Sequence, residues 1–306
     1  TYYGEKGVLR LLREDVSDFT LETLGFHAEG LERIHRATKQ KTGMILATGP
    51  TGSGKTTTLY TILGILNNSD VNISTIEDPI EYQIPRVNQT QVKPDIGFTF
   101  ANGLRALVRQ DPDIIMVGEI RDHETASLAI NAALTGHLVL STLHTNSAAG
   151  AIPRLIDLKA EPFLLISTLR VITGQRLVRQ LCAAKEKYKL NSSNLDKLAE
   201  HINMDKVLAS LKEEKVVGPK DSWPAISFYK PKPSVECEDG YSGRIGIHEV
   251  LYVSPAIERL ILSEPSTTDI ETEARKEGMM TMLEDGVFKA AQGITTLEEV
   301  FRVISE

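Results

Sequence analysis

A glycine-rich loop between an apolar run and an amphipathic segment constrains this fold more than any other feature. Residues 49–56 fit G-x-x-x-x-G-K-[ST], in which glycines let backbone N–H groups converge on a phosphate. The apolar run 44–47 before it is typical of a buried parallel strand, and apolar residues recur at helical spacing after it. Strand, glycine loop and helix amino terminus together form an anion site. The sequence therefore predicts a P-loop that binds a nucleoside triphosphate.

Each position of this loop has an expected task. Lys55 reaches the β- and γ-phosphate oxygens, and the hydroxyl of Thr56 is offered to Mg²⁺. The predicted phosphate-binding residues are Gly49, Pro50, Thr51, Gly52, Ser53, Gly54, Lys55, Thr56 and Thr57.

From residue 25 to about residue 180 the pattern alternates apolar strands with amphipathic helices. Such alternation predicts βα units, an α/β class and a mostly parallel sheet. We expect strands at 44–48, 71–76, 114–118 and 138–143, with helices after the P-loop, at 101–110 and at 123–134.

The flanking segments differ from this core. Residues 1–24 indicate a strand and a linker, left from a preceding module. Residues 181–240 contain a helical face followed by a Pro-rich stretch, which indicates a smaller module. Residues 241–306 begin with a strand-like run and close in two or three helices, the last starting at Thr295 or Thr296.

Composition narrows the possible functions. The chain has 306 residues and a formal net charge of −7, which argues against a protein that mainly grips nucleic acid. No apolar run approaches the ~20 residues that span a bilayer, so we expect the catalytic part to be soluble. Two cysteines, Cys182 and Cys237, are too few for a disulfide scaffold and fit a reducing compartment.

Acidic and histidine side chains follow the predicted strands. The carboxyl ends of parallel strands meet at one sheet edge, where ligands bind. A carboxylate there could also be a solvated loop charge, and a histidine could belong to the core. The candidates are Glu119 after strand 114–118, the carboxylates Glu77, Asp78 and Glu81 after strand 71–76, and His137 and His144 at the two ends of strand 138–143.

These segments closely resemble the secretion ATPase superfamily of type II secretion and type IV pili. Walker A is followed in order by "TIEDPIEY" (the Asp box, 75–81), "DPDIIMVGEIRD" (Walker B, 114–119) and "TGHLVLSTLH" (the His box, 137–144), and the resemblance covers essentially the whole chain. "GQRLVRQLC" and "GYSGRIGIHEVLYVSPAIERLI" are similar to the assembly and export branch. The resemblance implies a RecA-like P-loop core and a smaller, mainly helical C-terminal module.

The resemblance also implies residue roles. Glu81 would position and deprotonate the attacking water, and Glu119 would support Mg²⁺ with Thr56. His137 and His144 would report γ-phosphate occupancy to a subunit interface. Family members act as hexameric rings, in which an arginine from a neighbour can add ~10³ to 10⁵ in rate; Arg10 is our candidate. Arg109 and Arg121 flank Walker B and could pair with its acids or with an adjacent subunit.

The cysteine pattern of this sequence departs from that of the family. The assembly members usually carry two Cys-x-x-Cys pairs, whereas here Lys185 stands where a second thiolate would be. Structural zinc needs four ligands and two remain, so we predict no zinc. We expect residues 190–233 to stabilise the module by packing instead.

The resemblance implies an ATP-hydrolysing motor that powers type IV pilus assembly or type II secretion. It would act as a homo-hexamer in the cytoplasm, held at the inner membrane by a platform protein and by cytoplasmic recruitment proteins, without direct nucleic-acid contact. The alternatives are a ring that translocates nucleic acid, which the series Arg170, Arg176 and Arg179 would favour, a DNA-uptake pseudopilus motor, and a nucleotide-gated ring without turnover.

Overall fold

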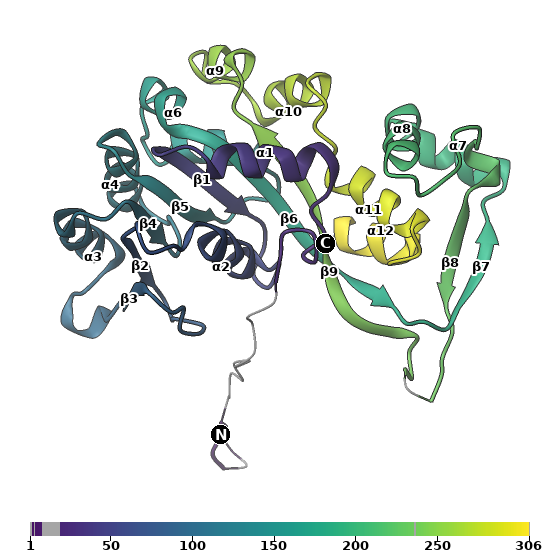
Figure 1. Ribbon diagram of the computed structural model, residues 1–306, viewed down its shortest axis with the longest axis horizontal. Coiled ribbons are helices and arrows are strands. Elements are labelled where there is room, and N and C mark those ends of the chain that lie inside the picture. The colour runs from purple at the N-terminus through teal and green to yellow at the C-terminus, as the bar shows by residue number, and fades with distance from the viewer. Residues whose placement is uncertain (1, 3, 8–18, 236, 306) are drawn as a thin grey trace.

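A seven-stranded sheet forms the centre of the molecule (Figure 1). The computed structural model describes residues 2, 4–7, 19–235 and 237–305. The strand order is β3-β2-β4-β5-β1-β6-β9, and every neighbouring pair is parallel except β6 and β9. The predicted α/β class with a mostly parallel sheet is confirmed. The strands are β1 (Gly43–Thr48), β2 (Ile73–Glu77), β3 (Val87–Gln91), β4 (Ile114–Val117), β5 (Leu138–Leu143), β6 (Leu169–Leu181) and β9 (Tyr241–Tyr252).

The central strands are buried on both faces because helices cover each side of the sheet. Alternate residues of β1 therefore enter different clusters. Ile45 and Ala47 pack with α1 (Ala28–Thr38) and α2 (Lys55–Leu66). Met44 and Leu46 belong to the opposite cluster, with α3 (Phe100–Leu107), α4 (His123–Leu134), α5 (Ala151–Asp157) and α6 (Pro162–Thr168).

The four predicted strands are all present, and the predicted helices correspond to α2, α3 and α4. Helix α3 ends at Leu107 and continues as a 3₁₀ turn over Val108–Gln110. The edge strand β3 was not predicted, because its sequence VNQTQ is mostly polar and only partly buried.

The C-terminal segment differs from the prediction. Strand β9 lies where the sequence indicated a strand-like run, and it pairs antiparallel with β6, from Val171↔Tyr252 to Leu181↔Tyr241, so it joins the central sheet. Four helices follow β9 in the described part of the chain, rather than two or three. They are α9 (Pro255–Ile261), α10 (Thr267–Lys276), α11 (Met282–Ala291) and α12 (Leu297–Ser305). The N–H of Glu299 donates to the Thr296 hydroxyl at 3.1 Å, which confirms the predicted start of the last helix.

An inserted module leaves the sheet between β6 and β9, on the far side of α11 and α12 from the core (Figure 1). It consists of β7 (Lys185–Lys189), α7 (Ser192–Ala199), α8 (Met204–Glu213) and β8 (Ser227–Pro231). Its apolar residues, among them Leu211, Trp223 and Phe228, pack against Val287 and Phe288 of α11. Burying side chains of this size contributes roughly 1.5–3 kcal/mol each, so packing does hold this segment.

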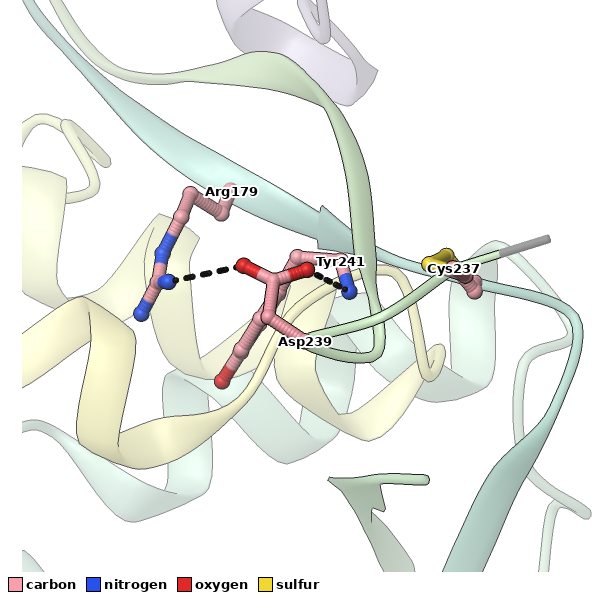
Figure 2. Close-up of a disulfide and its surroundings, with 5 residues drawn as sticks. Arg179, Cys237, Asp239 and Tyr241 are labelled. Carbon is pink, nitrogen blue, oxygen red and sulfur yellow. Dashed lines mark hydrogen bonds and ion pairs between the residues drawn. A yellow bond between two sulfur atoms is a disulfide. The ribbon is translucent and has the colours of Figure 1, made fainter. Parts of the chain in front are cut away.

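The base of the module contains a disulfide between Cys182 and Cys237 (Figure 2). The sequence indicated no disulfide scaffold, because it has only two cysteines; these are 55 positions apart, and nothing local in the sequence indicates their pairing. Lys185 donates to the carbonyl of Gly293 at 2.6 Å and lies 4.9 Å from the ring centre of Tyr229. In the described residues, no group of three or more His, Cys, Asp or Glu could hold a metal ion.

Residues 8–18 lie outside the description. Most of the predicted remnant strand of residues 1–24, including Arg10, falls there. Of the helices in the described residues, none is long and apolar enough to span a bilayer.

Candidate nucleotide site

The P-loop connects the carboxyl end of β1 to the amino terminus of α2. Gly49, Gly52 and Gly54 have φ of 144°, 80° and 89°, which are backbone conformations that residues with a side chain rarely adopt. A Cβ at Gly49 would lie 2.4 Å from the carbonyl oxygen of Gln175. Gly54 precedes Lys55, the first residue of α2, and no side chain caps this helix among the described residues. The first amides of α2 are therefore available to an anion.

Lys55 is held inside the loop. Its Nζ donates to the carbonyls of Gly49 at 2.8 Å and Pro50 at 3.0 Å, and the residue is 8% exposed. Burial lowers the pKa of Lys55, while the nearby Glu119 carboxylate opposes this effect. A buried ammonium in the concavity of a glycine loop is suited to binding phosphate oxygens.

Strand β6 braces the loop from one side. The Gln175 amide donates to the Ser53 carbonyl at 2.7 Å and accepts from the Thr58 hydroxyl at 2.9 Å. The Ser53 hydroxyl is buried and has no hydrogen-bond partner among the described residues. Sequence reasoning missed Gln175, because it lies more than 100 residues after the loop and belongs to no local motif.

A cavity of about 450 Å³ lies beside the P-loop at this sheet edge. Parts of Walker A, the Asp box, Walker B and the His box all line it. Leu177 of β6 and Arg244 of β9 also line it, although neither belongs to a sequence motif that predicts this position. The predicted site residues that line it are Thr51, Gly52, Gly54, Lys55, Thr56, Thr57, Glu77, Asp78, Glu81, Glu119 and His144.

Glu119 is the acid of Walker B, two residues beyond β4. It is 9% exposed, its Oε1 pairs with Arg121 at 2.6 Å and its Oε2 lies 3.2 Å from Nε2 of His144. Arg121 thus pairs with the Walker-B acid inside this chain. Arg109 is exposed in the 3₁₀ turn before β4, at the opposite end of that strand.

The Asp-box carboxylates occupy different environments. Glu77 is 2% exposed and accepts hydrogen bonds from the Tyr60 and Thr75 hydroxyls and from the Gln89 amide. Burial raises the pKa of Glu77, and these hydrogen bonds partly offset the effect. Glu81 is only half-buried at the cavity wall, and its N–H donates to Tyr60 at 3.4 Å. Both residues line the cavity, but Glu77 is buried and accepts three hydrogen bonds, whereas Glu81 is half-buried.

The two histidines of the His box are separated by the length of β5. His144 follows the carboxyl end of the strand and reaches Glu119. His137 precedes the amino end, beside Gly43, and its Nδ1 lies 2.8 Å from the carbonyl of Ala132. A six-residue strand is ~20 Å long, so His137 does not reach the cavity of its own chain. Its expected role at a subunit interface stays a prediction.

The arginine series of β6 bonds within the chain. Arg170 donates to the Thr42 carbonyl at 3.3 Å, Arg176 to the Val303 carbonyl at 2.5 Å, and Arg179 to Glu299 at 2.8 Å. These bonds anchor β6 to its neighbours. The arginine series, which would have favoured a nucleic-acid translocase, is therefore explained by contacts within the chain.

The chain matches the family model described as "Type II/IV secretion system protein" over residues 1–302. It belongs to this family. The type II secretion system protein E of Xanthomonas campestris pv. campestris is 47% identical, and the type IV pilus assembly ATPase PilB of Pseudomonas aeruginosa is 44% identical. Each similarity covers 100% of this chain and 51% of the relative. The chain thus spans about half the length of these curated relatives.

Solved structures support the same assignment. The pilus retraction motor PilT with bound ADP is 30% identical, with a TM-score of 0.65, over 95% of this chain and 68% of that one. The ATPase DotB of Legionella pneumophila is 25% identical, with a TM-score of 0.61, over 94% of this chain and 65% of that one. The resemblance drawn from the sequence boxes and the RecA-like P-loop core are both confirmed.

Glu249 of β9 is a buried carboxyl behind the His box. Its Oε1 accepts the N–H of Ala148 at 2.5 Å, in the loop that follows His144. Burial raises the pKa of Glu249 to about 7, and the hydrogen bond from Ala148 only partly offsets this. Between its ordinary value of 4.5 and about 7, Glu249 is protonated in the folded protein and ionised in the unfolded chain.

Lys55→Ala should weaken binding of a nucleoside triphosphate by roughly 10- to 100-fold, because a hydrogen bond from a charged group contributes about 1.5–3 kcal/mol. Isothermal titration calorimetry measures the affinity. Lys41→Ala, which removes an exposed lysine before β1, is the matched control and should leave it unchanged. Equal affinities for the Lys55→Ala and wild-type proteins would contradict the assignment of the loop.

Glu249→Gln should remove a pH dependence of folding stability. In the wild type, stability falls as pH rises from about 5 to about 7, because the native state retains a proton that the unfolded chain has released; the slope is at most about 1.4 kcal/mol per pH unit. Urea unfolding at several pH values measures the difference between the variant and the wild type. Glu32→Gln, at an exposed position of α1, should keep the wild-type slope. A wild-type slope in Glu249→Gln would show that this carboxyl ionises normally.

Proposed function

We propose that this chain is an ATP-hydrolysing motor domain that powers type IV pilus assembly or type II protein secretion from the cytoplasmic face of the inner membrane. The observation that carries the proposal is the convergence of Lys55, Glu119 and Glu81 on one cavity at the carboxyl edge of the sheet. Relatives named for both machines match along the whole chain, which supports the reading as a motor and leaves both machines open.

ATP would bind with its phosphates in the P-loop, where Lys55 and the amides of α2 meet the negative charge. Thr56 and Glu119 would hold Mg²⁺. The two residues line the same cavity, and Mg²⁺ is usually held by one or two protein oxygens together with substrate phosphates, so the donor set fits. When bound, Mg²⁺ supplies neutralisation of the phosphate charge.

Glu81 is the proposed catalytic base. It borders the cavity, so it can orient a water toward the γ-phosphate and accept its proton. Glu77 and Asp78 shape the Asp box. His144 would respond to the γ-phosphate through Glu119; the 3.2 Å contact between its ring and that carboxylate supports this role.

The motor would act as a homo-hexamer. Charge on the transferring phosphoryl group is best stabilised by an arginine from a neighbouring subunit, and Arg10 remains our candidate for that role. The proposed partners are an inner-membrane platform protein and cytoplasmic recruitment proteins, through which the ring would be held at the membrane. No direct nucleic-acid contact is proposed, since the β6 arginines already have partners within the chain.

Glu81→Gln should lower kcat for ATP hydrolysis by about 10²- to 10⁴-fold, the range for loss of a general base, and should change ATP affinity little. Glu77→Gln is the matched comparison. It alters the buried hydrogen-bond network, so it should lower the unfolding midpoint rather than selectively affect turnover. Normal hydrolysis by Glu81→Gln together with loss of hydrolysis by Glu77→Gln in a folded protein would place the base on Glu77.

Specific ATPase activity should rise with protein concentration as a hexamer forms, because each complete site needs a neighbour. Steady-state ATPase assays combined with light scattering measure both quantities, with Glu81→Gln as the inactive control. Activity that is independent of concentration in a monomer would mean that one chain holds a complete site, and the neighbouring arginine would be dispensable.

A further inference from the structure

The Cys182–Cys237 disulfide fastens the base of the inserted module. Cys182 directly follows β6, Cys237 lies four residues before β9, and their Cα atoms are 6.6 Å apart (Figure 2). The bond closes a loop that contains β7, α7, α8 and β8. It is the covalent link between the two points at which the module leaves and re-enters the sheet.

The two cysteines of this bond differ in exposure. A surface cavity of about 680 Å³ is lined by both cysteines and by Ser234, Val235 and Ser242. Cys182 is half-buried, whereas Cys237 is 7% exposed and Val235 is fully exposed. Because Cys182 is the more exposed residue and lines this cavity, we assign it as the point of attack for a small thiol.

The module does not depend on the disulfide to stay docked. Its apolar cluster packs on α11, and Lys185 binds the carbonyl of Gly293 at 2.6 Å. The turn before β9 is held by backbone hydrogen bonds and by contacts of Asp239. The N–H of Cys182 donates to the carbonyl of Gly240 at 3.0 Å, and Ser234 and Cys237 donate to each other's carbonyls at 2.9 and 3.1 Å. Asp239 accepts the N–H of Tyr241 at 3.0 Å and forms a 3.4 Å ion pair with Arg179, both exposed contacts (Figure 2). Breaking the disulfide removes the covalent tie and leaves the turn with these contacts alone, so residues 232–241 should loosen while the packed module stays in place.

The disulfide lies just beyond one end of the strand pair β6 and β9, whose other part borders the nucleotide cavity. β6 contains Gln175, which braces the P-loop, and Leu177, which lines the cavity, before it ends at Leu181. Arg179 of β6 pairs in register with Arg244 of β9, and Arg244 lines the cavity as well. Loss of order in the turn at Asp239 would therefore affect a strand pair that lines the nucleotide cavity.

We propose that Cys182 and Cys237 form a reversible thiol–disulfide site, reduced by a dithiol and oxidised by a low-molecular-weight disulfide. The inference rests on the proposed function in one respect, because a cytoplasmic motor would meet both reagents. The oxidised state fastens the base of the module, and the reduced state frees the turn at residues 232–241.

The exchange balances as follows. A thiolate of the dithiol attacks Sγ of Cys182, the bond between the two cysteines breaks, and Cys237 leaves as a thiolate that takes up a proton. The second thiol of the reductant then attacks the mixed disulfide, so that Cys182 is released and the reductant becomes a disulfide. Two electrons and two protons pass to the protein. Oxidation by a low-molecular-weight disulfide reverses this in two exchanges and releases two thiols.

The test uses the full chain, treated either with oxidised glutathione or with dithiothreitol that is then removed. N-ethylmaleimide labelling in denaturant and intact mass count the thiols, and hydrogen–deuterium exchange follows the peptides. We expect no label on the oxidised chain and two labels on the reduced chain. Exchange of residues 232–241 should accelerate at least fivefold on reduction, with β1 as the unchanged internal reference.

Cys182→Ser and Cys237→Ser should each show the fast exchange of residues 232–241 seen in the reduced wild type, in both redox states. Each should carry one label after dithiothreitol, and intact mass identifies any mixed disulfide that the remaining cysteine forms with glutathione. Ser242→Ala alters the same cavity without removing a sulfur and should keep the wild-type response. If a serine variant fails to fold, the redox titration of the wild type decides alone.

Three results would overturn the proposal. They are two labels per chain after treatment with oxidised glutathione, identical exchange of residues 232–241 in both states, and tight binding of one zinc ion per reduced chain, which would indicate a metal centre. ATP turnover is followed in the same samples. Its absence in both redox states would count against the motor proposal, whereas the thiol count and the exchange rates decide the thiol–disulfide site.

Discussion

The parallel register of β4, β5 and β1 is the constraint on which the candidate site depends. Val117 pairs with Ser141, and Thr48 with Leu143, so the three strands end at one edge. Side chains reinforce this alignment, because the hydroxyls of Ser141 and Thr142 donate to the carbonyls of Val117 and Gly118, each at 2.7 Å. The P-loop, Glu119 and His144 therefore leave the sheet next to one another, although about 100 residues separate the first of them from the last.

The antiparallel pair of β6 and β9 gives the fold its second organising element. One end of the pair packs beside β1 and braces the P-loop through Gln175. Farther along, Arg179 bonds to Glu299 of α12, where burial alone would raise the pKa of this carboxyl but the hydrogen bonds from Arg302 and Arg179 hold it at about 2. The far end carries the inserted module and its disulfide. A single strand pair thus connects the nucleotide cavity, the C-terminal helices and the module.

The two glutamates of the Asp box differ in their burial and in their hydrogen bonds. Glu77 and Glu81 have the same carboxyl group and lie four residues apart, and the sequence offers both as candidates. Tyr60 contacts both, but Glu77 is buried with three hydrogen-bond donors and has become part of the scaffold. Glu81 lies beyond the end of β2 at the cavity wall. The two carboxylates therefore differ in solvent access and in hydrogen bonding, and the proposal of Glu81 as the base rests on that difference.

The sequence by itself determined the α/β class, the four central strands, the P-loop and the family, because each of these is encoded by neighbouring residues: apolar runs, helical spacing and contiguous motifs. It also named most of the residues that line the cavity. Only the tertiary structure decided that Gln175 and Arg244 join the site, that β9 completes the sheet and that Cys182 bonds to Cys237. These features arise from contacts between segments far apart in the chain, which side-chain periodicity does not record. The partners of such a residue are determined only when the strands have assembled into the sheet and the helices have packed on it.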